Sequence, residues 1–151
     1  MKVWYITLMK LKNNLLVVSF LLVFTNTLAV ENFFDNAKRF YEKKEYEKSK
    51  FLFHRNLVFN PKDSKSYLYL AKIYNQEKNQ KKEEKNLEAT LLIEPNNEEA
   101  MLMLMKIALE KSNYSKVKSL SEDFVKVCKN LCNENKSILE SLANLEPKNE
   151  S

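Results

Sequence analysis

The chain has 151 residues, 44% of them hydrophobic and none of them glycine, so it can form one domain with one core but no glycine-rich phosphate-binding loop. With His54 as its single histidine, a catalytic triad or a multi-histidine metal site is hard to build, and we expect neither a metal nor a cofactor. The net charge of +5 includes three lysines in residues 1–29; the 22 basic and 20 acidic residues that follow are interleaved, which argues against nucleic-acid binding.

Residues 1–29 have the pattern of a secretory signal peptide. Lys2, Lys10 and Lys12 precede an apolar run from Leu15 to Phe24, and a small-residue end, Thr27–Ala29, follows. The run is short for a membrane span, which needs about 20 residues. An uncleaved anchor is the alternative, and Met9 is a second candidate start. Both interpretations place the rest of the chain outside the cytoplasm, so we expect an exported, periplasmic protein.

A 34-residue step dominates the rest of the chain. Pro61 and Pro95 stand one such step apart, and each closes a charged, helix-like segment. Large residues recur at the same interval, as in Phe33, Tyr67 and Met101. Within each segment the apolar residues follow a helical period, and no alternating strand pattern competes with it. A period of about 34 residues is typical of stacked helical hairpins, so the sequence predicts an all-α protein.

The residues at these positions resemble the tetratricopeptide repeat (TPR) pattern. The resemblance covers about two thirds of the chain and divides it into three units, 30–63, 64–97 and 98–131, of which the third is the weakest. It implies an α-solenoid of helical hairpins whose function is protein binding. The sequence departs from the pattern at three sets of positions: the hairpin turns, where glycine is usual, the small-residue positions of the second helices, and the last closing proline. These positions hold Lys44, Lys78 and Ser112; Asn56, Glu83 and Phe124; and Lys129.

After Leu131 we expect the repeat to stop and residues 132–151 to form a capping helix and a disordered tail. Ile138, Leu139 and Leu142 give this helix one apolar side. Cys128 and Cys132 lie at the junction, four residues apart, and an exported chain commonly pairs such cysteines. The sequence therefore predicts a disulfide that fastens the cap, with two free thiols as the alternative.

The resemblance also implies where a ligand binds, because TPR proteins generally hold ligands in the groove lined by the first helix of each hairpin. Carried over by position, the groove contains an apolar column, a lysine at the same phase in each unit, and a third row. These residues are Phe34, Leu68 and Leu102; Lys38, Lys72 and Lys106; and Tyr41, Asn75 and Leu109. An apolar column beside a row of lysines suits a peptide that carries acidic groups.

We therefore expect a non-enzymatic adaptor or assembly factor that binds a peptide or protein segment in an extracytoplasmic space. The alternative keeps Leu15–Phe24 in the membrane and makes the protein an anchored TPR scaffold within an inner-membrane assembly. In that case the N-terminal segment is the only membrane contact. An enzyme is disfavoured because the tight acidic pairs, Glu83–Glu84 and Glu98–Glu99, are typical of helix starts and solvated faces.

Overall fold

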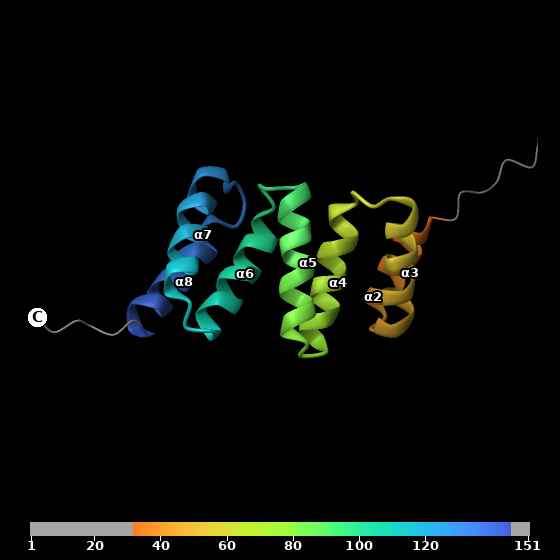
Figure 1. Ribbon diagram of the computed structural model, residues 1–151, viewed down its shortest axis with the longest axis horizontal. Coiled ribbons are helices and arrows are strands. Elements are labelled where there is room, and N and C mark those ends of the chain that lie inside the picture. Colours follow the sequence, from red (N-terminus) through yellow and green to blue (C-terminus); the bar gives the residue numbers. More distant parts are fainter. Residues whose placement is uncertain (1–31, 146–151) are drawn as a thin grey trace, which may run out of the picture. The chain divides into compact units, whose positions relative to one another are not determined.

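The computed structural model describes residues 32–145, which contain seven helices and no strand. In chain order the helices are α2 (Phe33–Glu42), α3 (Tyr46–Phe59), α4 (Ser64–Gln76), α5 (Gln80–Ile93), α6 (Glu98–Glu110), α7 (Tyr114–Val127) and α8 (Cys132–Leu145). Six of them form three hairpins, α2–α3, α4–α5 and α6–α7, and α8 follows as a single helix (Figure 1). This confirms the predicted all-α hairpin array. The expected leader and tail lie outside the described residues.

The helices begin and end where the local sequence allows. The side-chain oxygens of Asn79, Asn97 and Asn113 each accept a hydrogen bond of 3.0–3.2 Å from the backbone N–H three residues later. These caps satisfy N–H groups that have no partner inside their helix. No helix within residues 32–145 is long and apolar enough to span a membrane.

Each hairpin turn contains one residue with a left-handed backbone. Lys44, Lys78 and Ser112 have φ angles of 60°, 56° and 54°. They are the three positions at which the repeat pattern usually has glycine. For a residue with a Cβ atom this conformation costs about 1–2 kcal/mol, because the Cβ approaches the following carbonyl oxygen. The 34-residue step is therefore visible in the backbone as well as in the side chains.

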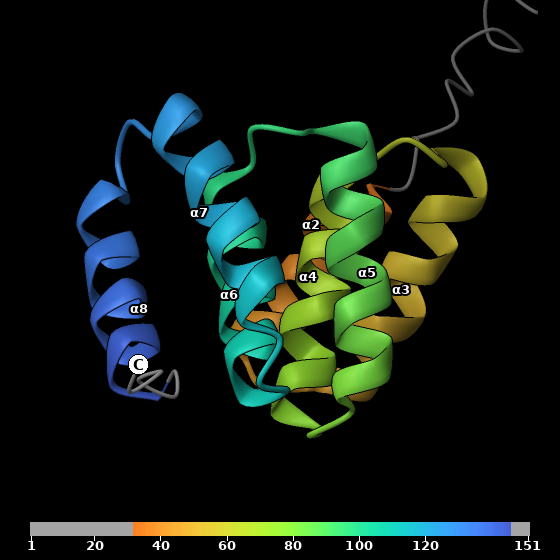
Figure 2. The same ribbon diagram turned by 60° about the vertical axis from the view of Figure 1, so that its left-hand side comes forward.

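The hairpins stack in chain order, and each first helix also packs on the hairpin before it. Leu70 and Ile73 of α4 enter the core of the first hairpin beside Phe53. Leu104 and Ile107 of α6 enter the core of the second hairpin in the same way. The last core lies between α6, α7 and α8, and α8 supplies Ile138 and Leu142 to it. Figure 2 shows these three helices beside one another. One side of each first helix therefore belongs to the preceding hairpin.

Two of the three residues that stand where the pattern expects small ones in the second helices are polar, and hydrogen bonds compensate their burial. Asn56 is 5% exposed, and its Nδ2 donates to Asp63 Oδ2 at 2.7 Å and to Ser66 Oγ at 2.9 Å. These bonds join α3 to the start of α4. Glu83 is 4% exposed and accepts a 3.0 Å hydrogen bond from Asn75 Nδ2. Burial raises the pKa of Glu83, because desolvation penalises its charged form.

The expectation that the repeat stops after Leu131 is wrong. Helices α4, α6 and α8 begin at Ser64, Glu98 and Cys132, so each start lies one full repeat step after the last. Ile138 and Leu142 of α8 are buried at the positions that Leu104 and Ala108 occupy in α6. Helix α8 is therefore the first helix of a fourth unit in register. The sequence concealed this because the closing proline and several apolar positions are replaced, for example Met101 by Asn135.

Candidate binding face

Helices α2, α4 and α6 share one side of the array, and side-chain contacts connect them across it. Tyr41 of α2 meets Tyr69 of α4 edge-on, with ring centroids 5.1 Å apart. Lys72 Nζ of α4 lies 2.8 Å from Glu99 Oε2 of α6. We call this surface the first-helix face. It consists of the connected residues and those one repeat step away, namely Phe34, Lys38, Tyr41, Tyr69, Lys72, Glu99, Met103 and Lys106.

Tyr69 is the centre of an aromatic cluster on this face. Its ring stacks on the buried Phe53 at 5.1 Å and meets Phe34 edge-on at 5.9 Å. Lys72 Nζ lies 5.0 Å from the centroid of the same ring. Burial, followed by the nearby Tyr46 and Tyr69, raises the pKa of Tyr41. The cluster offers a ligand half-buried ring surfaces that are held rigidly by packing.

The three lysines that recur at the repeat step differ in whether an acidic side chain pairs with them. Lys72 is paired with Glu99, whereas Lys38 lies 3.8 Å from Glu42 on its own helix, with both side chains largely exposed. Lys106 is exposed and forms no ion pair within residues 32–145. The row is therefore paired across hairpins at Lys72, loosely paired within α2 at Lys38, and unpaired among residues 32–145 at Lys106. Exposed pairs such as Lys38–Glu42 contribute only about 0–1 kcal/mol, so they can reopen to a ligand.

The predicted apolar column is corrected by the structure at two of its three positions. Leu68 and Leu102 are only 8% and 5% exposed, because they pack into the second and third cores. Phe34 is half-buried against Phe53 and Tyr69. The apolar surface on this side therefore comes from the ring cluster rather than from a leucine column.

Two residues of the third predicted row, Asn75 and Leu109, make contacts inside the array instead of facing a ligand. Asn75 donates to Glu83 of α5, and Leu109 is half-buried against the last core. Among Tyr41, Asn75 and Leu109, Tyr41 is the one that joins the ring cluster. Of the nine predicted residues, the structure thus brings Phe34, Tyr41 and Lys72 together around the ring of Tyr69.

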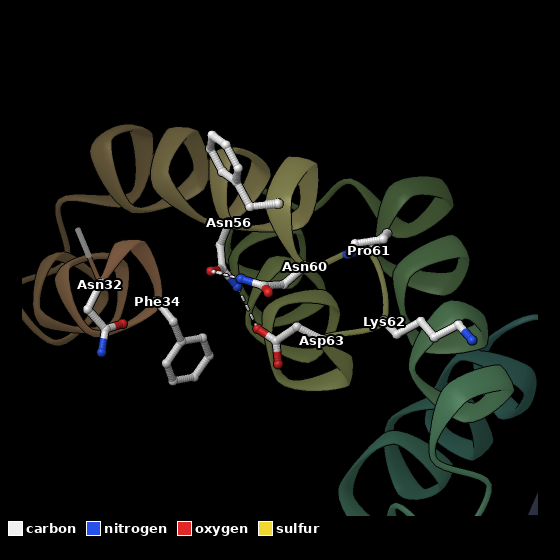
Figure 3. Close-up of a pocket in the computed structure, with 8 residues that line it drawn as sticks. Asn32, Phe34, Asn56, Asn60, Pro61, Lys62 and Asp63 are labelled. Carbon is white, nitrogen blue, oxygen red and sulfur yellow. Dashed lines mark hydrogen bonds between the residues drawn. The ribbon is translucent and has the colours of Figure 1, made fainter. Parts of the chain in front are cut away.

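Two shallow depressions lie where hairpins join, and the repeat step relates them. The first, of about 640 Å³, is lined by Phe34, Phe59 and the loop Asn60–Asp63 (Figure 3). The figure shows Asn56 between Asn60 and Asp63, with hydrogen bonds to both. The second, of about 400 Å³, contains the equivalents of these residues, among them Leu68, Glu94, Asn96 and Asn97. Each depression lies at an end of a first helix and extends the face toward the loops.

The wall of the second depression is built around Glu98. Its carboxylate accepts hydrogen bonds from the backbone N–H groups of Leu131 at 2.7 Å, Lys129 at 2.9 Å and Asn130 at 3.0 Å. These bonds, led by the one from Leu131, hold the pKa of Glu98 below its usual range. Cys128 and Cys132 form a disulfide across the same loop, with Cα atoms 5.4 Å apart. Carboxylate and disulfide together fix the start of α8.

His54 and the acidic residues are the remaining candidates for a catalytic or metal-binding role. His54 Nε2 lies 3.3 Å from the Tyr74 hydroxyl, and burial, followed by Lys50 and Lys82, lowers the pKa of His54. Within the described part of the chain, no group of three or more His, Cys, Asp or Glu side chains is arranged to hold a metal ion.

Reasoning from the sequence missed Tyr69 and Glu99. The TPR positions predict Leu68 as a groove residue, one residue before Tyr69. Spacing along the sequence does not show that the ring of Tyr69 contacts side chains of another hairpin. Glu99 was assigned to a helix start, and it lies too far along the chain from Lys72 to give a local signal of an ion pair. A search for opposite charges on successive first helices would have found it.

No protein-family model and no curated protein matches the sequence. The structure is similar to solved structures. It matches the Sgt2 TPR domain from Aspergillus fumigatus with a TM-score of 0.63 and 16% identity, covering 83% of this chain and 89% of that one. The chain has a tetratricopeptide repeat fold. The TPR array also matches the Yersinia enterocolitica type III secretion chaperone SycD, solved with a peptide of the translocator YopD, at a TM-score of 0.69 and 15% identity, covering 80% and 96%. A third match is the CopN–Scc3 complex, at a TM-score of 0.60 and 15% identity, covering 82% and 74%.

Proposed function

We propose that this protein is a non-enzymatic adaptor or assembly factor that holds a peptide or protein segment on its first-helix face. The observation that carries the proposal is the rigid ring cluster of Phe34, Tyr41 and Tyr69, on a face whose two end lysines, Lys38 and Lys106, are exposed and not paired with a neighbouring hairpin. Half-buried rings supply contact area at little conformational cost, and flanking charges select acidic groups. Similar folds have been solved with a bound peptide or protein partner, which supports this use of the array.

The compartment is part of the proposal. The pattern of residues 1–29 supports export, and the Cys128–Cys132 disulfide suits an oxidising space such as the periplasm. Sequencing the N-terminus of the protein recovered from its native cells tests this directly. A first residue near Val30 supports the soluble adaptor, whereas an intact apolar run supports the membrane-anchored scaffold.

Site-specific photo-crosslinking in those cells tests the binding face. A crosslinker placed at Tyr69 should capture a defined partner, and one placed at Lys85, an exposed residue of α5, serves as the control. The double variant Lys38→Glu/Lys106→Glu should then weaken capture at Tyr69 and reduce its salt dependence while leaving helicity unchanged. Equal capture from both positions, or capture that the charge reversal does not alter, would contradict the proposal.

A further inference from the structure

Helix α3 has apolar residues on its outer side as well as on its buried side. Phe51, Val58 and Phe59 are 63%, 77% and 64% exposed. At 3.6 residues per turn, these three side chains lie on one stripe of the helix with Lys48 and Arg55. We call these five residues the α3 patch. Exposed apolar side chains that are grouped, unlike those scattered singly, mark interaction sites in soluble proteins.

The repeat itself provides the comparison that makes this patch unusual. The equivalents of Phe51 in α5 and α7 are Lys85 and Ser119, which are exposed and polar. Leu92, the equivalent of Val58, is also exposed, but its helical neighbours Lys85 and Glu88 are charged. The same structural position is therefore an ordinary solvated surface elsewhere in the array. Only the first hairpin combines aromatic and cationic residues on this stripe within residues 32–145.

Contacts on α2 extend and order the patch. The Arg55 guanidinium lies 4.6 Å from the centroid of the Phe33 ring, and Phe33 stacks on Phe59 at 5.6 Å. Lys48 Nζ lies 5.4 Å from the centroid of Phe40 and forms an exposed ion pair with Glu45 at 2.6 Å, which an anionic surface would have to replace. Rings carrying cations over their faces are held in place, so the surface is preorganised rather than loosely exposed.

Another hairpin of the same kind does not fit on this end of the array. In α4 and α6 the positions that enter the preceding core hold Leu70 and Ile73, then Leu104 and Ile107. Their equivalents in α2 are Asn36 and Arg39. Because those positions are polar, the surface is suited to a partner that accepts both rings and positive charge.

The positive charge of the first hairpin distinguishes between two further partners, a second copy of the chain and an anionic lipid surface. The first hairpin, residues 32–59, contains seven basic and four acidic residues, whereas residues 60–145 contain fourteen and thirteen. A second copy paired symmetrically on the patch would place Arg55 and Lys48 against the same residues of its partner, which is unfavourable. An anionic lipid surface matches the patch better, since aromatic residues enter the headgroup region while lysine and arginine side chains reach the phosphates.

We propose that the α3 patch is a peripheral docking site for an anionic lipid surface. Seven residues, 25–31, separate the apolar run Leu15–Phe24 from the start of the described residues. Fully extended, they span no more than about 25 Å. If the run is retained as an anchor, this end of the array stays near the bilayer. If it is removed, the patch alone brings the array to the surface, and the first-helix face remains a separate site.

Co-sedimentation with vesicles tests the proposal on residues 30–151, which include the compact unit and its cores. Vesicles of phosphatidylglycerol and phosphatidylcholine should bind the protein in a salt-dependent manner, and phosphatidylcholine alone should not. The variants Lys48→Glu/Arg55→Glu and Phe51→Ser/Phe59→Ser should each weaken binding by at least about tenfold. The control Lys81→Glu/Lys85→Glu changes the same charge on α5 and should bind nearly as well as the wild type.

Three outcomes would overturn the proposal: no binding to the anionic vesicles, an equal loss in the α5 control, or binding to polyglutamate without binding to vesicles. Circular dichroism of each variant shows whether a loss reflects unfolding. If the double serine variant unfolds, Phe51→Ser alone, which places in α3 the residue that α7 has at this position (Ser119), keeps the test decisive because it removes the ring without adding a charge.

Discussion

Lys72 of α4 and Glu99 of α6 form an ion pair with a Nζ–Oε2 distance of 2.8 Å, and this pair connects the second and third hairpins. It stands in the middle of the row of lysines, so an acidic ligand has to compete with Glu99 for Lys72. Lys38 and Lys106 do not face that competition from a neighbouring hairpin. Under the proposed function, an acidic ligand would therefore be recognised mainly by Lys38 and Lys106, at the two ends of the face.

A double-mutant cycle on Lys72→Ala and Glu99→Ala should give a coupling energy of about 0.2–1 kcal/mol, the usual range for partly exposed pairs. Urea unfolding at low and high salt measures this coupling, which should fall as salt screens the charges. In binding experiments Glu99→Gln should strengthen capture of an acidic partner, because Lys72 is released. Unchanged coupling at high salt would show that packing rather than charge joins these residues.

Because the hairpin-turn residues have positive φ angles, we expect glycine at these positions to stabilise the folded protein. Lys78→Gly should raise the free energy of unfolding by about 1 kcal/mol, because glycine adopts φ 56° without a Cβ clash. Lys78→Val should lower it, since a β-branched residue fits this region worst. Thermal unfolding of the two variants gives the comparison. A destabilised glycine variant would mean that the lysine side chain contributes more than the backbone does.

Glu83 predicts a pH dependence of stability with a definite sign. Burial raises its folded pKa above the unfolded value, so its stabilising contribution is complete below the unfolded pKa and is lost as pH rises through the folded pKa. Glu83→Gln should therefore be more stable than the wild type at neutral pH, and the advantage should shrink on acidification. Urea unfolding from about pH 4 to pH 8 measures this. The exposed Glu88→Gln is the control, and a pH-independent advantage for Glu83→Gln would contradict the mechanism.

The fold was predictable because its signal is repeated. The prolines Pro61 and Pro95 and the apolar positions of the helices recur at the same step, so each unit supports the interpretation of the others. The register of α8 was missed because polar Asn135 and Lys129 replace the residues that mark a unit. A repeat array that ends in water needs polar residues on its last exposed side, and the exposed Lys136, which stands at the position of the buried Leu102, removes another part of the apolar pattern.

The candidate face was less predictable, because it depends on orientation. Leu68 and Tyr69 are adjacent in sequence, and only packing decides that the leucine is buried while the tyrosine bridges two hairpins. The period puts the three lysines in phase, yet the ion pairs of Lys38 and Lys72 depend on Glu42 and Glu99, which a period alone does not pair with them.

Because the disulfide and Glu98 hold the start of α8, we expect α8 to unfold locally before the other helices when the disulfide is removed. In exported material the mass should be lower by two hydrogens than after reduction, and two free thiols would contradict the bridge. Cys128→Ser/Cys132→Ser should lower stability by about 2 kcal/mol, the amount expected for so short a loop. Amide hydrogen exchange should then accelerate in α8 before α4 or α5. Uniform acceleration would show that the cap does not open separately.

Two buried asparagines give opposite predictions for the same substitution. The Oδ1 atom of Asn135 has no hydrogen-bond partner among residues 32–145, whereas Asn56 is bonded to Asp63, Ser66 and Asn60. A buried polar group without a partner costs about 1–3 kcal/mol, and a satisfied group loses its bonds and leaves others unpaired when it is removed. Asn135→Leu should therefore stabilise the protein by about 1 kcal/mol or more.

Asn56→Leu should instead destabilise it, because Ser66 Oγ and Asp63 Oδ2 would each lose the hydrogen bond from Asn56 at the junction of α3 and α4, leaving Asp63 with the one from Ser66. Urea unfolding of both variants, with sedimentation to check that Asn135→Leu stays monomeric, makes the comparison. The check matters because Leu at position 135 restores an apolar residue where Met101 and Tyr67 stand in the other units. If both variants were destabilised alike, the polar residue in α8 would have to be held by a partner, and α8 would be more than a cap.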